Sequence, residues 1–114
     1  MVTCVDWDLA VIRKAFVMRL NSDQVSQYKY RHDNIWPELA ALLRSHGVHN
    51  YSIFLHPQTC QLFAYAEIEN EQRWQAIAHS PICQKWWQFM ADIMATNPDA
   101  SPQTIELAEM FHLD

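Results

Sequence analysis

The spacing of hydrophobic and polar residues changes several times along the chain, and these changes predict the order of the secondary-structure elements. The stretch 12–20 mixes β-branched and aromatic residues with charges at its ends, which is typical of a strand covered on both faces in its middle. Residues 49–55 and 61–68 predict two further strands, joined by a hairpin-like turn at 56–59. The segment 105–113 predicts a final strand.

The first two helices are predicted between the first and second strands. A turn offers Ser22 or Asp23 as an N-cap, and a helix then runs to about His32. A second helix is predicted over 37–46, because a proline stands in its first turn and leucines recur at helical spacing. Gly47, the only glycine of the chain, is placed to end this helix in the left-handed conformation.

The second half of the chain predicts helices over 69–78 and 82–95, separated by a break at 79–81. The order is then β-α-β-β-α-β, which is the ferredoxin-like arrangement of an α+β protein with helices on one face of an antiparallel sheet. No helix remains to cover the other face. We therefore expect a homodimer in which two sheets meet across a two-fold axis.

Composition narrows the class of protein. A chain of 114 residues forms one domain, and its formal net charge of -5 disfavours nucleic acid and anionic membranes as partners. No stretch approaches the roughly 20 apolar residues of a membrane span. The scattered thiols Cys4, Cys60 and Cys83 form no CxxC pair, and the first ten residues lack Lys and Arg. These features predict free thiols and a cytoplasmic protein.

A histidine with aromatic neighbours is the sharpest candidate for chemistry. Tyr28 and His32 stand at i and i+4 of the predicted helix and share a face, and Trp36 follows after a break. Histidine exchanges protons near neutral pH, and a phenol holds polar ligands. The plain alternative is a histidine hydrogen-bonded at a helix end, as the five other histidines in turns, helix ends and the last strand suggest.

The adjacent indoles Trp86 and Trp87 are the second candidate. Trp86 fits an apolar helical stripe with Phe89 and Met90, so core packing is the simplest interpretation for it. Both indoles cannot share that stripe, so at least one is expected at the sheet edge or in an open cavity. Tyr51, on a predicted strand, fits either a sheet interior or the rim of such a site.

Other kinds of site have weak support. His46 and His49 are three residues apart, but Gly47 breaks the helix that would align them, and no HxxxH or HExxH spacing occurs. Cys83 lies in an apolar helix without a well-placed base, which disfavours a cysteine nucleophile. One glycine rules out a glycine-rich phosphate loop. We expect neither a metal nor a cofactor.

Taken together and in order, several segments resemble the L-rhamnose mutarotase family over about residues 11–114, with spacing kept. The matching segments are Arg13–Phe16, Tyr28–Glu38, Ser45–Gly47 leading into His49–Tyr51, Cys83–Trp87, Asn97–Asp99 and Phe111–Asp114. The resemblance implies a dimeric α/β barrel and interconversion of the α and β anomers of L-rhamnose. It also implies that His32 is the proton donor and that Tyr28, Tyr51, Trp86 and Trp87 contact the sugar.

Two departures from the family pattern stand out. Where the family often has Asn-Pro, this chain has Asp33-Asn34, and the added carboxylate is expected to raise the pKa of His32. The leader 1–10 lies outside the resemblance, and Val11 stands where such proteins usually begin with Met. We therefore expect a single domain over 11–114, and we hypothesise that translation starts at a valine codon at residue 11 and not at Met1.

Two other functions remain open on the sequence alone. The same dimeric barrel also suits a small cofactor-independent monooxygenase or a haem-handling protein, because function depends on the site and not on the fold. A non-catalytic module that binds the sugar is a third possibility.

Overall fold

The computed structural model describes residues 11–114, and the predicted leader 1–10 lies outside them. A four-stranded antiparallel sheet with the order β2-β3-β1-β4 forms one layer. Its strands are β1 (Ile12–Arg19), β2 (Val48–His56), β3 (Gln61–Ile68) and β4 (Ile105–Leu107). This order is that of the ferredoxin-like fold, as predicted.

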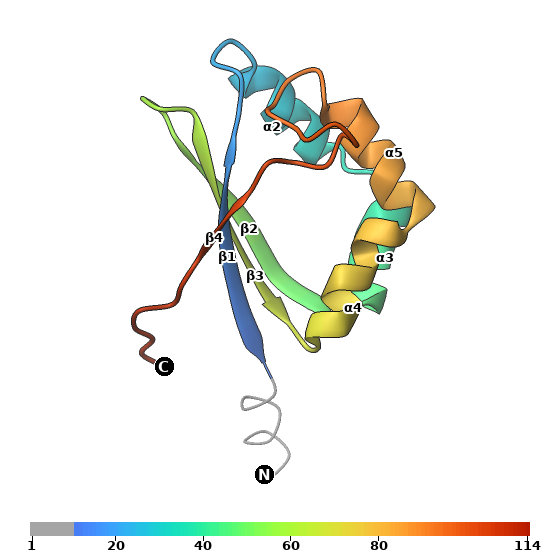
Figure 1. The fold of residues 1–114 in the computed structure, drawn as a ribbon, viewed down its shortest axis with the longest axis vertical. Helices are drawn as coiled ribbons and strands as arrows, with labels where there is room; N and C mark the ends of the chain where they lie inside the picture. Colours follow the sequence, from blue (N-terminus) through green and yellow to red (C-terminus); the bar gives the residue numbers. More distant parts are fainter. Residues whose placement is uncertain (1–10) are drawn as a thin grey trace, which may run out of the picture.

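All the described helices cover the same face of the sheet (Figure 1). They are α2 (Val25–Asp33), α3 (Pro37–Ser45), α4 (Glu71–Ala76) with the 3-10 turn η1 (Ile77–His79), and α5 (Pro81–Met90). We call the sheet face toward the helices the inner face and the opposite face the outer face. The inner face carries the apolar side chains of β3, which are at most 2 % exposed: Leu62, Ala64, Ala66 and Ile68.

One helix terminus agrees with its prediction from the sequence, and another does not. Gly47 has a φ of +78° directly after α3, as predicted, and a Cβ there would lie 3.0 Å from the Glu69 side chain. At the start of α2, by contrast, the predicted N-cap is wrong. Gln24 holds that position, and its side chain makes no capping hydrogen bond. A backbone turn, Gln24 N–H to Asn21 O at 3.1 Å, replaces the side-chain cap.

The last helix is shorter than predicted, since α5 ends at Met90 instead of Ala95. Beyond it the chain turns to meet the end of β1: Ala95 N–H donates to Arg19 O at 3.0 Å, and Asn21 N–H donates to Ile93 O at 2.9 Å. Ile93 is only 1 % exposed. Backbone pairing with the end of β1 and burial have therefore overridden the helical periodicity of this segment.

The last strand is also shorter than predicted. Pairing with β1 stops at Leu107, and the next anchor is a side-chain ion pair between Glu109 and Arg13 at 3.0 Å. The chain then runs off on the side away from the helices (Figure 1). This C-terminal tail, residues 108–114, carries side chains that are 79–90 % exposed: Met110, Phe111 and Leu113.

The outer face of the sheet leaves large apolar side chains open. Phe54 on β2 is 65 % exposed, and Ile105 and Leu107 on β4 are 66 % and 42 % exposed. Within residues 11–114, no helix has the length and apolar character needed to cross a membrane.

Candidate active site

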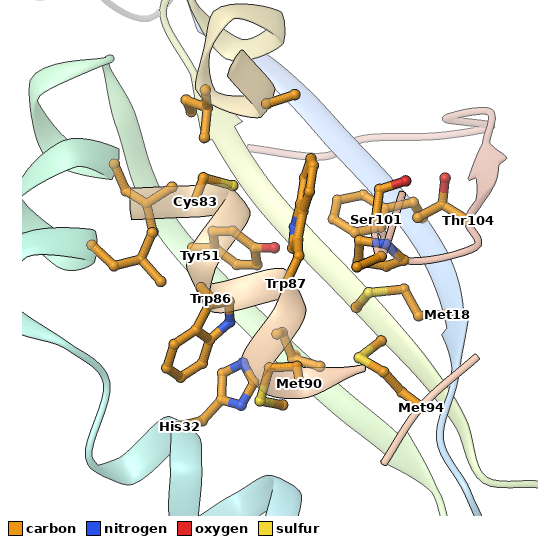
Figure 2. Close-up of a pocket in the computed structure, with 18 of the residues that line it drawn as sticks. Met18, His32, Tyr51, Cys83, Trp86, Trp87, Met90, Met94, Ser101 and Thr104 are labelled. Carbon is orange, nitrogen blue, oxygen red and sulfur yellow. The ribbon is translucent and has the colours of Figure 1, made fainter. Parts of the chain in front are cut away.

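A cavity of about 450 Å³ lies between the helices and the inner face of the sheet. This volume is in the range of roughly 300–1,000 Å³ that is usual for small-molecule sites. Its lining includes all the residues singled out from the sequence: Tyr28, His32, Tyr51, Trp86 and Trp87. They come from three elements, α2, β2 and α5, which the fold brings to one place (Figure 2).

The imidazole of His32 is held in one orientation by its own helix. Its Nδ1 lies 3.1 Å from the backbone carbonyl of Tyr28, one turn earlier, and its ring stacks on the Tyr28 ring at 4.2 Å. A carbonyl oxygen only accepts hydrogen bonds, so Nδ1 carries a proton and donates it. In the neutral ring the lone pair is then on Nε2, which is the nitrogen left for a ligand.

The pKa of His32 is lowered from its usual value of 6.5, and burial is the main cause. The hydrogen bond to Tyr28 O and the charge of Asp33 both act in the opposite direction, but more weakly. Asp33 also turns toward solvent, where its carboxylate accepts from Lys29 Nζ at 2.8 Å. The expectation that Asp33 raises the pKa of His32 is confirmed in its direction, but burial outweighs this effect, and the resting imidazole is neutral at pH 7.

The two tyrosines are held as neutral phenols. Burial raises the pKa of Tyr28 well above its usual value, and burial with a smaller effect of Cys83 raises the pKa of Tyr51 to about 12. Tyr51 lines the open cavity, which leaves 37 % of its surface accessible although protein surrounds it densely, and its hydroxyl is directed toward Trp87 (Figure 2). Both phenols can therefore donate and accept hydrogen bonds at neutral pH.

The two indoles lie differently, and both line the cavity. Trp86 is 8 % exposed on the buried side of α5, and its ring meets His32 edge-on at 5.4 Å. On another side it meets Trp36 at 5.1 Å. Trp87 is only partly buried and stands in the cavity (Figure 2). The prediction that at least one indole faces an open cavity is confirmed, and Trp86 serves both the core and the cavity wall.

An arginine holds α2 against the end of α5. The Arg31 guanidinium donates to Phe89 O at 2.7 Å and forms a bidentate pair with Asp92, at 2.9 and 3.3 Å. It also lies over the Phe89 ring, 4.5 Å from the centroid. Because His32 follows Arg31 directly and Trp86 is one turn from Phe89, this contact fixes the distance between the two halves of the site.

Several residues that line the cavity were not predicted from the sequence. Phe16 and Met18 of β1 and Trp74 of α4 complete the wall of the cavity, together with the segment 100–104 after α5. Alternation along β1 places Phe16 and Met18 on one face and could have indicated them. The segment 100–104 has no such signal, because only the tertiary fold brings this loop to the cavity.

The structure also places the residues of two weaker candidate sites, a cysteine nucleophile and a histidine metal site. Cys83 lines the cavity, but burial raises the pKa of its thiol to about 11, so it is not an activated nucleophile. His46 and His49 make separate contacts, His46 with Leu42 O and His49 with Glu69. Among residues 11–114, no group of three or more His, Cys, Asp or Glu side chains is arranged to hold a metal ion.

Comparison with known proteins gives close relatives. The family model for L-rhamnose mutarotase matches residues 13–113. An L-rhamnose mutarotase from Opitutus terrae is 61 % identical over 104 residues, which are 91 % of this chain and 100 % of the relative. The crystal structure of an L-rhamnose mutarotase from Formosa agariphila superposes with a TM-score of 0.84 at 47 % identity, over 90 % of this chain and 99 % of that one.

More distant structures share only the fold. A putative antibiotic biosynthesis monooxygenase from Nitrosomonas europaea has a TM-score of 0.62 at 12 % identity, covering 90 % of this chain and 92 % of that one. A dimeric ferredoxin-like protein from an uncultured marine organism has a TM-score of 0.61 at 10 % identity, covering 97 % and 99 %. Both agree with the four-stranded ferredoxin-like architecture described above.

Proposed function

The chain belongs to the L-rhamnose mutarotase family and interconverts the α and β anomers of L-rhamnopyranose, and we propose that His32 carries the proton in this reaction. It is an isomerase acting at the anomeric carbon. Membership of this family disfavours the monooxygenase, haem-handling and non-catalytic binding alternatives. The observation that carries the role of His32 is its neutral imidazole, held with Nε2 available beside both indoles and both phenols.

The proposed reaction needs one group that takes and returns a proton. Neutral His32 accepts the proton of the C1 hydroxyl on Nε2 while the electrons of that O–H bond form the aldehyde carbonyl. The C1–O5 bond breaks, its electron pair stays on the ring oxygen, and the imidazolium donates the proton there. Both oxygens are bonded to C1, so one nitrogen serves both, and His32 is the proton donor for ring opening.

Closure reverses these steps after rotation about the C1–C2 bond. The O5 hydroxyl attacks the other face of the aldehyde, Nε2 takes the proton from O5, and the new C1 hydroxyl recovers it. Protons and electrons balance without an oxidant or a reductant. A group that works in both directions is most efficient when its pKa lies near the operating pH, which suits a histidine.

The tyrosines and indoles are proposed to hold the sugar. Tyr28 and Tyr51, as neutral phenols, would exchange hydrogen bonds with ring hydroxyls. Trp86 and Trp87 would cover the apolar side of the ring, which in this 6-deoxy sugar includes a methyl group. A hydrophobic wall of this kind discriminates by about 1–3 kcal/mol for one small apolar change.

The test is anomer exchange of L-rhamnose followed by proton NMR saturation transfer. We expect transfer between the α and β H1 signals to grow with the concentration of protein. His32→Ala should reduce the catalysed rate by about 10²–10⁴-fold, because general acid–base catalysis is lost. His56→Ala, an exposed histidine at the end of β2, is the matched control. Exchange near the wild-type rate in a folded His32→Ala protein would exclude this role.

A homodimer is the proposed assembly. The outer face of the sheet and the C-terminal tail leave several large apolar side chains exposed, which a monomer in water rarely does over one continuous surface. A second copy presents the same surface, so a two-fold axis covers both at once. The marine protein of similar fold is itself described as dimeric, which supports this assembly.

The cytoplasm is the proposed location. Cys60 and Cys83 are free thiols, and a reducing compartment keeps thiols in that form. Fractionation of the cells that make the protein would test this.

A further inference from the structure

Strand β2 contains an irregularity next to Tyr51. Its register against β3 shifts between His49 and Ser52, so that β2 has one residue more than β3 over this stretch. Such an insertion is a β-bulge, and bulges often redirect a side chain beside a functional site. Asn50, inside the bulge, has a φ of +50°, a left-handed conformation that asparagine tolerates better than most residues.

The bulge decides which way Tyr51 points. Val48 pairs with Ile68 and faces inward, where both are almost fully buried. In a regular strand, residues 50, 52 and 54 would then share that face, and Tyr51 would point outward. The extra residue reverses the alternation, so that Ile53 pairs with inward-facing Ala64. Tyr51 and Ile53 consequently line the cavity.

The side chain of Asn50 ties the bulge to the neighbouring strand. Its Nδ2 donates to Glu67 Oε1 at 2.8 Å, and the other carboxylate oxygen accepts from the Tyr65 hydroxyl at 2.9 Å. These two donors hold the pKa of the Glu67 carboxyl below its usual value, so it stays an acceptor at neutral pH. Glu67 pairs with His49, at the last regular position before the shift.

We propose that Asn50, through Glu67, is a positioning residue that fixes the bulge and thereby presents Tyr51 to the sugar. The amide and the carboxylate lie on the outer face of the sheet and do not line the cavity. They act on the site only through the backbone of β2. This inference rests on Tyr51 being a sugar contact, as proposed above.

The experiment compares variants on both sides of this hydrogen bond. Asn50→Gly keeps the backbone free to adopt a positive φ and removes the amide, and Glu67→Ala removes the acceptor. Each should raise the KM for L-rhamnose about 3- to 10-fold, the size expected for one misplaced hydrogen bond, with kcat nearly unchanged. Glu67→Gln keeps an Oε1 acceptor and should behave as wild type. Ser52→Ala, an exposed neighbour on β2, is the matched control.

The same substitution in a protein that already carries Tyr51→Phe shows whether the rise in KM depends on Tyr51. With Tyr51→Phe already present, Asn50→Gly should add no further rise in KM, because the hydroxyl that it positions is gone. An undiminished further rise would overturn the inference, and so would a wild-type KM for Asn50→Gly alone. If Tyr51→Phe by itself leaves KM unchanged, the sugar-contact role fails first, and the positioning role fails with it.

Two further measurements separate positioning from a general loss of structure. The Asn50 and Glu67 side chains lie on the proposed dimer face, so the mass of each variant is measured by light scattering at the assay concentration. The ring signals of Tyr51, which packs against Phe16 at 6.5 Å and Trp74 at 6.3 Å, should shift in Asn50→Gly. They should remain in place in Ser52→Ala. Unshifted Tyr51 signals in Asn50→Gly would overturn the inference.

Discussion

At the scale of single residues, burial sets the protonation states on which the chemistry depends. His32 has a pKa below 6.5, while the phenols of Tyr28 and Tyr51 have raised pKa values. The site is therefore neutral at pH 7: a base with a free lone pair on Nε2 stands beside two hydrogen-bond donors. Such a site suits an uncharged sugar, since no net charge has to be desolvated when the sugar enters.

The lowered pKa of His32 leads to a specific pH dependence. If neutral His32 starts the reaction, kcat/KM should be constant from pH 8 down to about 6.5 and should fall below that, approaching tenfold per unit under the lowered pKa. The measurement is saturation transfer at each pH, with the uncatalysed exchange subtracted and folding checked by circular dichroism. A kcat/KM that rises between pH 7 and 5.5 would instead identify the imidazolium as the resting form.

Residue-level predictions from the sequence succeeded where neighbours in sequence are also neighbours in space. The stacking of Tyr28 on His32 follows from their spacing of four on a helix. The net pKa of His32 could not be predicted in this way. The nearby Asp33 was visible in the sequence, but the burial that outweighs its charge involves Trp86 of α5, which lies 54 residues away along the chain.

At the scale of elements, the site depends on how α2 meets α5. The contact of Arg31 with Asp92 and Phe89 O joins the end of one helix to the residues at the end of the other. The Arg31 side chain is only 12 % exposed, and it holds the pKa of the Asp92 carboxyl below its usual value. The pair is therefore better enclosed than an ordinary surface ion pair, although the Asp92 side chain is 67 % exposed.

Loss of this contact should loosen the site. Arg31→Met is expected to lower the free energy of unfolding by about 1–2 kcal/mol and to lower kcat/KM, because His32 and Trp86 are no longer held together. Arg31→Lys should recover the charge but not the bidentate geometry. Its stability and its kcat/KM should therefore lie between those of the wild type and those of Arg31→Met. Urea unfolding and saturation transfer measure the two effects.

A matched control lies on the same helix. Lys29→Met removes the exposed i,i+4 pair with Asp33, whose side chains are 74 % and 56 % exposed, and should change stability by less than about 0.5 kcal/mol. If Arg31→Met behaves like Lys29→Met in both measurements, the contact does not position the helices.

Predictions of elements failed where tertiary pairing competes with local pattern. The periodicity of 82–95 is helical throughout, yet the chain leaves the helix at Met90 to pair with the end of β1. On β2, simple alternation puts Tyr51, Ile53 and Leu55 on one face, and the structure agrees with this, since Ile53 and Leu55 pair with inward-facing residues of β3 and Tyr51 lines the cavity. It gave no sign of the bulge that puts Val48 on that same face, because a bulge is a property of two paired strands.

At the scale of the whole molecule, the two faces of the sheet have different structural roles. The inner face and the helices enclose the cavity, and the outer face with the C-terminal tail remains open. The sequence predicted this division from the lack of a spare helix. It did not predict the tail, which was expected to continue the last strand to residue 113 but leaves the sheet after Leu107.

This separation allows the dimer to be tested without altering the sugar site. Phe54 is 65 % exposed on the outer face of β2 and does not line the cavity. Phe54→Glu would bury a carboxylate in the interface of two sheets, which should weaken association by about a hundredfold or more. Light scattering should give twice the 13.4 kDa chain mass for the wild type and the single mass for the variant at micromolar concentration.

Gln58→Glu, in the β2–β3 turn, makes the same change of charge away from the apolar surface and should stay dimeric. A wild-type protein of single mass would exclude the dimer outright, and a dimeric Phe54→Glu protein would move the interface away from this face. The monomeric variant should still exchange anomers, because His32 and both indoles lie on the helix side of the sheet within one chain. An inactive but folded monomer would show instead that the second copy is needed to hold β2 and its bulge in place.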